Sequence, residues 1–174
     1  MENYKQLMNQ IRCFVFDVDG VLTDGKVTLM PTGEQVRVMN TRDGYAIKQA
    51  LKQGFKVCII TGGQDQSVKT RMHYLGVQDV YLGAYDKEEA LEDYCACYDL
   101  KPEQMAYMGD DMPDYLVMKK VALAACPKDA VEDIKAISHY ISPLAGGAGC
   151  VREFIEQTLR TQGLWEKDSG IESH

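Results

Sequence analysis

Short apolar runs alternate with amphipathic stretches along most of this chain. Runs rich in branched and aromatic residues and bounded by turn formers are typical of buried strands. These runs lie at residues 11–16, 55–60, 79–82, 104–108, 121–125 and 139–142. The stretches between and around them have helical length and spacing, at residues 2–9, 43–53, 65–75, 87–98, 112–120 and 150–162. This alternation predicts an α/β fold, a three-layer, doubly wound and mostly parallel sheet.

One segment departs from the alternation. Residues 26–39 hold two short runs on either side of a Pro-Thr-Gly-Glu turn, which predicts a protruding β-hairpin. No linker or repeat interrupts the rest, so we predict a single domain over residues 1–174. The polar end, from about residue 163 to residue 174, is predicted to be a loose tail.

Composition narrows the classes of partner. The 174 residues carry a net charge of −7, which disfavours nucleic acid and anionic membranes. No apolar run is long enough to cross a bilayer and no apolar signal core follows Met1, so we expect a cytoplasmic protein. The six cysteines are scattered and fit small buried hydrophobes or surface thiols better than a zinc site.

The first strand ends in two acidic residues, Asp17 and Asp19. Alternation along an extended chain puts both carboxylates on the same side, where they repel each other unless a cation lies between them. Oxygen ligands of this kind suit Mg²⁺. The alternative is a strand end that turns polar on reaching solvent, but the Asp-x-Asp-Gly-x-x-Thr pattern favours the metal.

Polar residues also follow other predicted strands. Thr61 ends the second strand, Asp110 and Asp111 end the fourth, and Lys87 begins a helix. Carboxyl ends of parallel strands share one edge of a sheet, so these side chains should converge on one crevice. There Asp17 can attack phosphorus, Asp19 can act as acid and base, and Thr61 and Lys87 can hold a phosphate. A solvated helix start is the alternative for Lys87.

These residues resemble, in order, the four motifs of the haloacid dehalogenase superfamily: residues 16–23, Thr61 with Gly62, Lys87, and residues 109–114. The resemblance implies a Rossmann-like fold of the haloacid dehalogenase type. It implies that Asp17 is the nucleophile and that Asp17, the main-chain oxygen of Asp19, and Asp110 hold Mg²⁺. Asp111 and Asp114 then have a supporting role.

A closer resemblance covers nearly the whole chain, through residues 17–25, 42–47, Arg71 and 146–153. It is similar to the 3-deoxy-D-manno-octulosonate 8-phosphate phosphatases of lipopolysaccharide synthesis. The resemblance implies substrate contacts from Asp19, Arg42, Gly62, Gly63, Arg71 and Lys87. Gly63 stands where many of these enzymes have Arg, so a sister family acting on nonulosonate 9-phosphates is the alternative. Arg42 and Arg71 could also be solvated.

The gaps between the motifs are too short to hold a cap domain, which leaves the crevice open. The hairpin carries apolar residues, among them Leu29 and Val36. We therefore expect a homotetramer in which hairpins cover neighbouring crevices and Arg152 lies near a site, as the resembling family implies. A phospho-acceptor receiver domain is a remote alternative. A receiver has its acidic pair after the first strand and a lone acceptor Asp after the third, whereas here a second acidic pair follows Lys87.

Overall fold

The computed structural model describes residues 3–167 and residue 170. Six parallel strands form one sheet in the order β5-β4-β1-β6-β7-β8. They are β1 (Cys13–Phe16), β4 (Lys56–Ile60), β5 (Asp79–Tyr81), β6 (Met105–Met108), β7 (Leu123–Cys126) and β8 (Tyr140–Ile141). The predicted α/β class with a doubly wound parallel sheet is confirmed.

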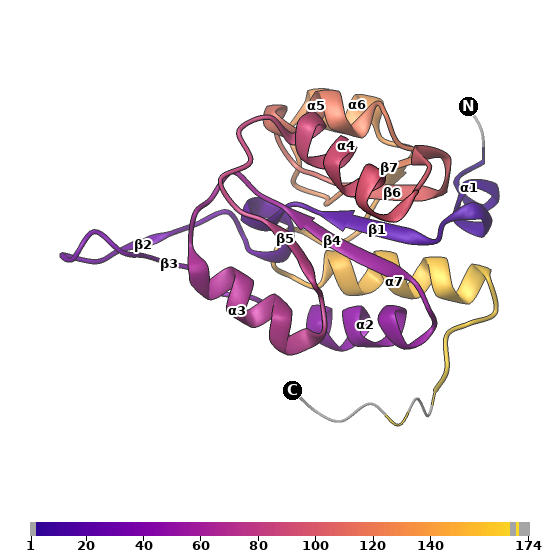
Figure 1. Cartoon of the computed structure of the whole chain (residues 1–174), viewed down its shortest axis with the longest axis horizontal. Helices are drawn as coiled ribbons and strands as arrows, with labels where there is room; N and C mark the ends of the chain where they lie inside the picture. Colours follow the sequence, from indigo (N-terminus) through magenta and orange to yellow (C-terminus); the bar gives the residue numbers. More distant parts are fainter. Residues whose placement is uncertain (1–2, 168–169, 171–174) are drawn as a thin grey trace.

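Both faces of the sheet are covered, which makes three layers (Figure 1). Phe14 and Phe16 of β1 face one buried cluster, whereas Cys13 and Val15 face the other. The first cluster includes residues of α1 (Tyr4–Gln10), α2 (Thr41–Lys52), α3 (Gln66–Leu75) and α7 (Cys150–Thr161). The second includes residues of α4 (Lys87–Tyr98), α5 (Tyr115–Met118) and α6 (Glu132–Ile137). A strand buried on both faces explains why its sequence is an unbroken apolar run.

Short polar side chains fix where three helices begin. Asn40, Asp65 and Asp86 precede α2, α3 and α4, and each accepts a hydrogen bond from a backbone amide in the first turn. Such caps satisfy amides that have no partner inside the helix. One consequence concerns the turn at Thr61, which does not lie at the N-terminus of α3. Helix α3 begins only at Gln66, and Asp65 occupies its N-terminus.

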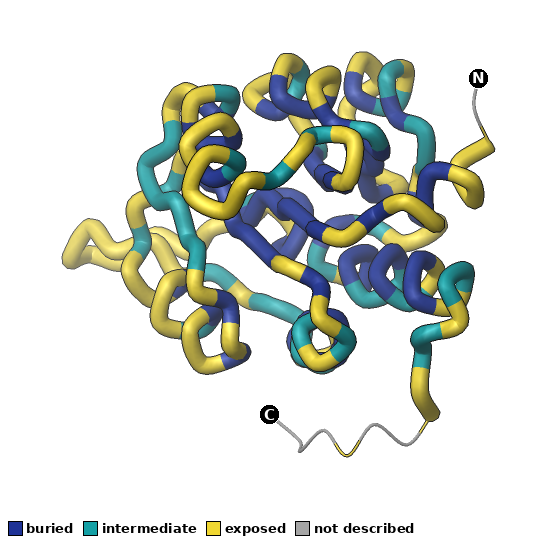
Figure 2. The backbone as a smooth tube through the Cα atoms, turned by 45° about the vertical axis from the view of Figure 1, so that its right-hand side comes forward, coloured by how far each residue is buried: buried dark blue, intermediate teal, exposed yellow. Residues whose placement is uncertain are grey.

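The hairpin extends away from the sheet and its helices (Figure 1). Its strands, β2 (Thr28–Leu29) and β3 (Gln35–Val36), have two residues each and are exposed on both faces (Figure 2). The predicted helix at 112–120 is instead a turn of 3₁₀-helix, Met112–Asp114, followed by α5. Pro113 lies at the start of that turn, and Asp114 is turned inward and fully buried. A second 3₁₀ turn, Pro102–Gln104, leads into β6.

The glycine-rich bend at 146–149 packs against the turn that follows β1. A Cβ at Gly146 would overlap the carbonyl of Gly20, and one at Gly147 would lie 2.6 Å from the amide nitrogen of Asp24. Gly147 N donates to Val21 O (3.0 Å). Glycine is needed here because two backbone segments touch. The bend therefore supports the loop that carries the acidic motif.

Part of the predicted loose tail is packed. Trp165 contacts Tyr45 of α2 edge to face, with ring centroids 6.2 Å apart, and Arg152 Cζ lies 4.7 Å from the Trp165 ring centroid. Gln49 Nε2 donates to Glu166 O (3.0 Å). Residues 164–166 are thus held against α2 and α7, while most of the rest of the predicted tail lies outside the described residues. No helix in the described part of the chain is long and apolar enough to span a membrane.

Candidate active site

The site lies where the chain order of the sheet reverses. From β1 the chain first adds β4 and β5 on one side, and it then returns to add β6 on the other. Open α/β sheets bind ligands at such a point, beyond the carboxyl ends of the strands. A crevice of about 430 Å³ occupies this place, and most of the predicted site residues line it: Asp17, Asp19, Thr61, Gly62, Gly63, Lys87, Asp110 and Asp111.

Lys87 contacts two carboxylates at the crevice: Asp17, which lines it, and Asp114, which lies behind the lining. Its Nζ lies 3.0 Å from Asp17 Oδ1 and 2.7 Å from Asp114 Oδ1. All three side chains are buried. Val18 N also donates to Asp17 Oδ1 (2.7 Å), so this oxygen of Asp17 is held by two donors. The arrangement fixes the carboxylate that the sequence identified as a nucleophile.

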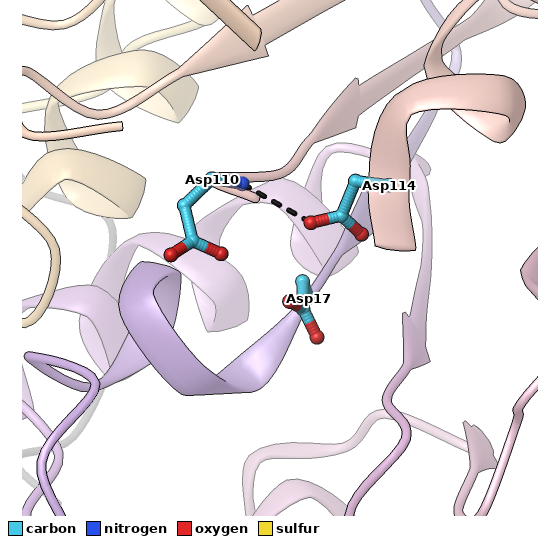
Figure 3. A group of neighbouring side chains, drawn as sticks. All are labelled: Asp17, Asp110 and Asp114. Atoms are coloured by element: carbon cyan, nitrogen blue, oxygen red, sulfur yellow. Dashed lines mark hydrogen bonds between the residues drawn. The ribbon is translucent and has the colours of Figure 1, made fainter. Parts of the chain in front are cut away.

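Asp114 has the contacts of a supporting residue. Its Oδ1 accepts hydrogen bonds from Lys87 Nζ and from the Tyr107 hydroxyl (2.8 Å), and its Oδ2 accepts one from Asp110 N (3.1 Å). Figure 3 shows the last of these bonds, between the strand end that carries Asp110 and the turn that carries Asp114. A Cβ at Gly109 would lie 2.5 Å from the Asp114 side chain, so glycine makes room for it. Tyr107 was not identified from the sequence, because it occupies a buried strand position like any core aromatic.

The crevice has an excess of buried negative charge. Oxygens of Asp17, Asp110 and Asp114 all lie within 4.8 Å of one another (Figure 3). Burial, and then repulsion by Asp114, raises the pKa of Asp17 to about 8. Burial, and then the charges of Asp114 and Asp111, raises the pKa of Asp110 to about 7. Burial alone would lower the pKa of Lys87, but the carboxylates outweigh it and the net shift is upward.

One ammonium therefore faces three carboxylates in this cluster. A divalent cation with oxygen ligands would balance the remaining charge. Because the oxygens of Asp114 are already engaged, Asp17 and Asp110 are the carboxylates best placed to hold such an ion. The donor set thus fits the predicted Mg²⁺.

The turn after β1 brings these groups together. Gly20 has φ +86°, and a Cβ at this position would overlap the Asp110 carboxylate. Only glycine fits such a position. The turn directs the Asp19 side chain toward the hairpin, where Arg37 contacts it. Arg37 was not identified from the sequence, since alternation within the hairpin gave no reason to connect it to Asp19.

The loop after β4 presents a hydroxyl to the crevice. Thr61 is buried, and its Oγ1 accepts a hydrogen bond from Gly63 N (3.2 Å), which leaves its own hydrogen free to donate. Gly83 N and Ala84 N donate to the carbonyls of Gly63 and Thr61, which fixes the loop. Phosphate contacts here would come from the loop, not from the terminus of α3.

Two residues predicted to contact the substrate, Arg42 and Arg71, do not line this crevice. Arg42 and Arg152 line a separate hollow beside α7. Arg71 Cζ lies 5.7 Å from the ring centroid of Tyr74, its neighbour on α3. Neither Arg42 nor Arg71 lines the crevice of its own chain.

Comparisons with known proteins agree with the motifs. Residues 76–154 match the family model of haloacid dehalogenase-like hydrolases. The 3-deoxy-D-manno-octulosonate 8-phosphate phosphatase of Escherichia coli K12 is 38% identical over 160 residues, which is 92% of this chain and 85% of the relative.

Solved structures show the same similarity. The same enzyme from Yersinia pestis superposes with a TM-score of 0.94 at 35% identity, covering 98% of this chain and 92% of that one. The one from Moraxella catarrhalis, in complex with a magnesium ion, a phosphate ion and a KDO molecule, gives a TM-score of 0.90 at 30% identity, over 94% of each chain. The chain belongs to the 3-deoxy-D-manno-octulosonate 8-phosphate phosphatase family of haloacid dehalogenase-like hydrolases.

Proposed function

We propose that this protein is a Mg²⁺-dependent phosphatase that hydrolyses 3-deoxy-D-manno-octulosonate 8-phosphate to the free sugar acid and phosphate, in the synthesis of lipopolysaccharide precursors. The observation that carries the proposal is the Asp17–Lys87–Asp114 network beside Asp110, in a chain of this family. A carboxylate fixed on a rigid strand end and flanked by positive charge is suited to attack a phosphoryl group.

In the proposed reaction Asp17 Oδ2 attacks phosphorus and forms an aspartyl-phosphate, while the sugar oxygen leaves. Asp19 gives a proton to the leaving oxygen and then takes one from the water that hydrolyses the intermediate. Lys87 and the Thr61 hydroxyl hold oxygens of the phosphoryl group. Mg²⁺, when held by Asp17, Asp110 and the main-chain oxygen of Asp19, supplies positive charge that offsets the carboxylates and the phosphate.

The eight-carbon substrate is supported by the relatives, since both solved structures and the Escherichia coli relative are phosphatases of that compound. Nonulosonate 9-phosphates are the alternative that Gly63 suggests. Steady release of many phosphates per chain is the experiment that tests for an enzyme. A receiver domain would stop after a single phosphoryl group.

We also propose that the chain acts as one uncapped domain in a cytoplasmic homotetramer. The hairpin supports this assembly, because Leu29 and Val38 are 73% and 79% exposed at its surface. Tyr85, Met112 and Leu116 are exposed beside the crevice and offer apolar partners. Burying both surfaces together would stabilise the assembly and exclude water from the crevice.

Replacing both Leu29 and Val36 with Asp should therefore dissociate the tetramer. We expect at least about tenfold more loss of kcat/KM on the sugar phosphate than on p-nitrophenyl phosphate, since the neighbour would no longer shape the sugar end of the crevice. Light scattering measures the assembly, and assays with both substrates on the same preparation measure the two losses of kcat/KM. Ile141→Asp, at an exposed position on the edge strand β8, is the matched control and should change neither the assembly nor kcat/KM. A fully active wild-type monomer would contradict the assembly.

A further inference from the structure

Arg37, which follows β3, reaches from the hairpin back to the catalytic turn. Its Nε donates to Asp19 Oδ1 (2.7 Å) and its Nη2 to Asp19 Oδ2 (3.2 Å). The side chain is only 10% exposed. Nη1 lies 3.6 Å from Asp65 Oδ2 and donates to the Gln35 carbonyl (3.2 Å). The guanidinium thus connects the hairpin, the turn after β1 and the loop before α3.

A two-point contact of this kind fixes the plane of a carboxylate. Arginine presents its donors in a rigid fork, so both oxygens of Asp19 are held at once. Within residues 3–167 and 170, no other side chain donates a hydrogen bond to this carboxylate. Each carboxylate oxygen has a second lone pair, which the fork leaves open. Asp19 can therefore be held in place and still exchange a proton with the substrate or with water.

Gly63 lies directly beside this contact. A Cβ at Gly63 would lie 3.7 Å from Arg37 Nη2 and 3.9 Å from Asp19 Oδ2. A Cβ fits at these distances, so only a side chain that extends further in the same direction would meet the ion pair. Gly63 therefore leaves this side of the Arg37–Asp19 contact uncovered beside the crevice.

We infer that Arg37 is a positioning residue, which holds the Asp19 carboxylate in the orientation that its acid and base steps need. The inference rests on the proposed phosphatase reaction. Because Arg37 belongs to the hairpin, it also ties the orientation of that exposed segment to the catalytic turn. When a proton-transfer group is no longer held within reach of its target, the reaction rate falls by orders of magnitude.

The two half-reactions allow a sharp test with p-nitrophenyl phosphate. Its leaving group departs as a stable anion, so forming the aspartyl-phosphate needs no proton from Asp19. Hydrolysing the intermediate still needs a base. In Arg37→Ala we therefore expect a rapid burst of about one p-nitrophenol per active site, followed by a steady rate lower by on the order of tenfold or more. Wild-type protein should show a smaller burst or none.

Further variants show whether Arg37 acts through Asp19. Arg37→Ala combined with Asp19→Asn should be no slower than Asp19→Asn alone, because the residue that Arg37 positions is already disabled. Arg37→Lys should regain part of the rate, since an ammonium can contact one oxygen. Lys26→Ala, which removes an exposed cation of the hairpin, is the control and should match the wild type. Light scattering on each variant shows whether the assembly is intact. If Arg37→Ala dissociates, the rate of Arg37→Lys is used to test the inference instead.

Two results would overturn the inference. One is a rise in KM confined to the sugar acid with kcat unchanged, which would make Arg37 a substrate contact. The other is a full additional loss from Arg37→Ala in the Asp19→Asn protein. Failure of the proposed function has a different signature. Wild-type protein would then leave octulosonate 8-phosphate intact, while the burst of Arg37→Ala with p-nitrophenyl phosphate would still support the role of Arg37.

Discussion

Replacing Asp17 with Asn should lower kcat by on the order of 10³-fold or more. Asn keeps the shape of the side chain but cannot attack phosphorus. Asp17 directly follows β1 and is 7% exposed, with one oxygen held by Val18 N and Lys87 Nζ. Asp114 cannot replace it, because the oxygens of Asp114 accept three hydrogen bonds. Steady-state phosphate release from the sugar phosphate and from p-nitrophenyl phosphate measures the loss.

The matched control is Asp24→Asn. Asp24 belongs to the same acidic segment, but it is exposed and accepts a hydrogen bond from Lys26 N (2.9 Å). It should keep wild-type kcat, because it does not line the crevice. If Asp17→Asn retained a tenth of the wild-type activity, the nucleophile would have to be another residue.

Removing the metal is the second change with a large expected effect. Excess EDTA should abolish turnover and added Mg²⁺ should restore it, since the cluster of Asp17, Asp110 and Asp114 has more negative charge than Lys87 can balance. Ca²⁺ should bind but support turnover poorly. Mg²⁺ demands a tight octahedron, whereas Ca²⁺ accepts longer bonds that would misplace the phosphoryl group. Full activity in excess chelator would contradict the metal requirement.

The same chelation should change stability in a pH-dependent way. Without metal, the raised pKa values of Asp17 (about 8) and Asp110 (about 7) mean that the folded protein binds protons more tightly than the unfolded chain. The stability from these protons is fully present below the ordinary pKa of Asp and is lost as pH rises through about 7 to 8. Mg²⁺ binds the ionised carboxylates, so its addition should raise Tm more at about pH 8.5 than at about pH 6. An equal gain in Tm at the two pH values would count against metal binding by these carboxylates.

Much of the fold follows from local patterns. Short apolar runs bounded by turn formers, such as Cys13–Phe16 and Lys56–Ile60, favour buried strands. The helix predicted at 43–53 begins at Thr41, because Asn40 caps it. Pattern did not show that the predicted helix at 112–120 breaks after Asp114. That break accompanies a buried network around Asp114 that only the folded chain contains. Trp165 packs on α2 through a contact with Tyr45, which is far from it in the sequence.

In the site, too, some residues could be predicted from local patterns and others depend on distant contacts. Asp17, Asp110 and Lys87 were predicted to converge because parallel strands end at one edge of a sheet, and the crevice contains all three. Arg37 and Tyr107 were missed, since each looks ordinary in its own element and gains a role only through a distant partner. Arg42 and Arg71 were carried over from a resemblance, and within one chain they do not line the crevice.

The most direct test is kcat/KM for 3-deoxy-D-manno-octulosonate 8-phosphate and for a nonulosonate 9-phosphate, measured with Mg²⁺ on one preparation. We expect steady turnover of both and a preference of at least about tenfold for the eight-carbon substrate, because the crevice must distinguish sugar acids whose carbon chains differ in length. A preference for the nine-carbon substrate, or no turnover of the eight-carbon one, would contradict the account.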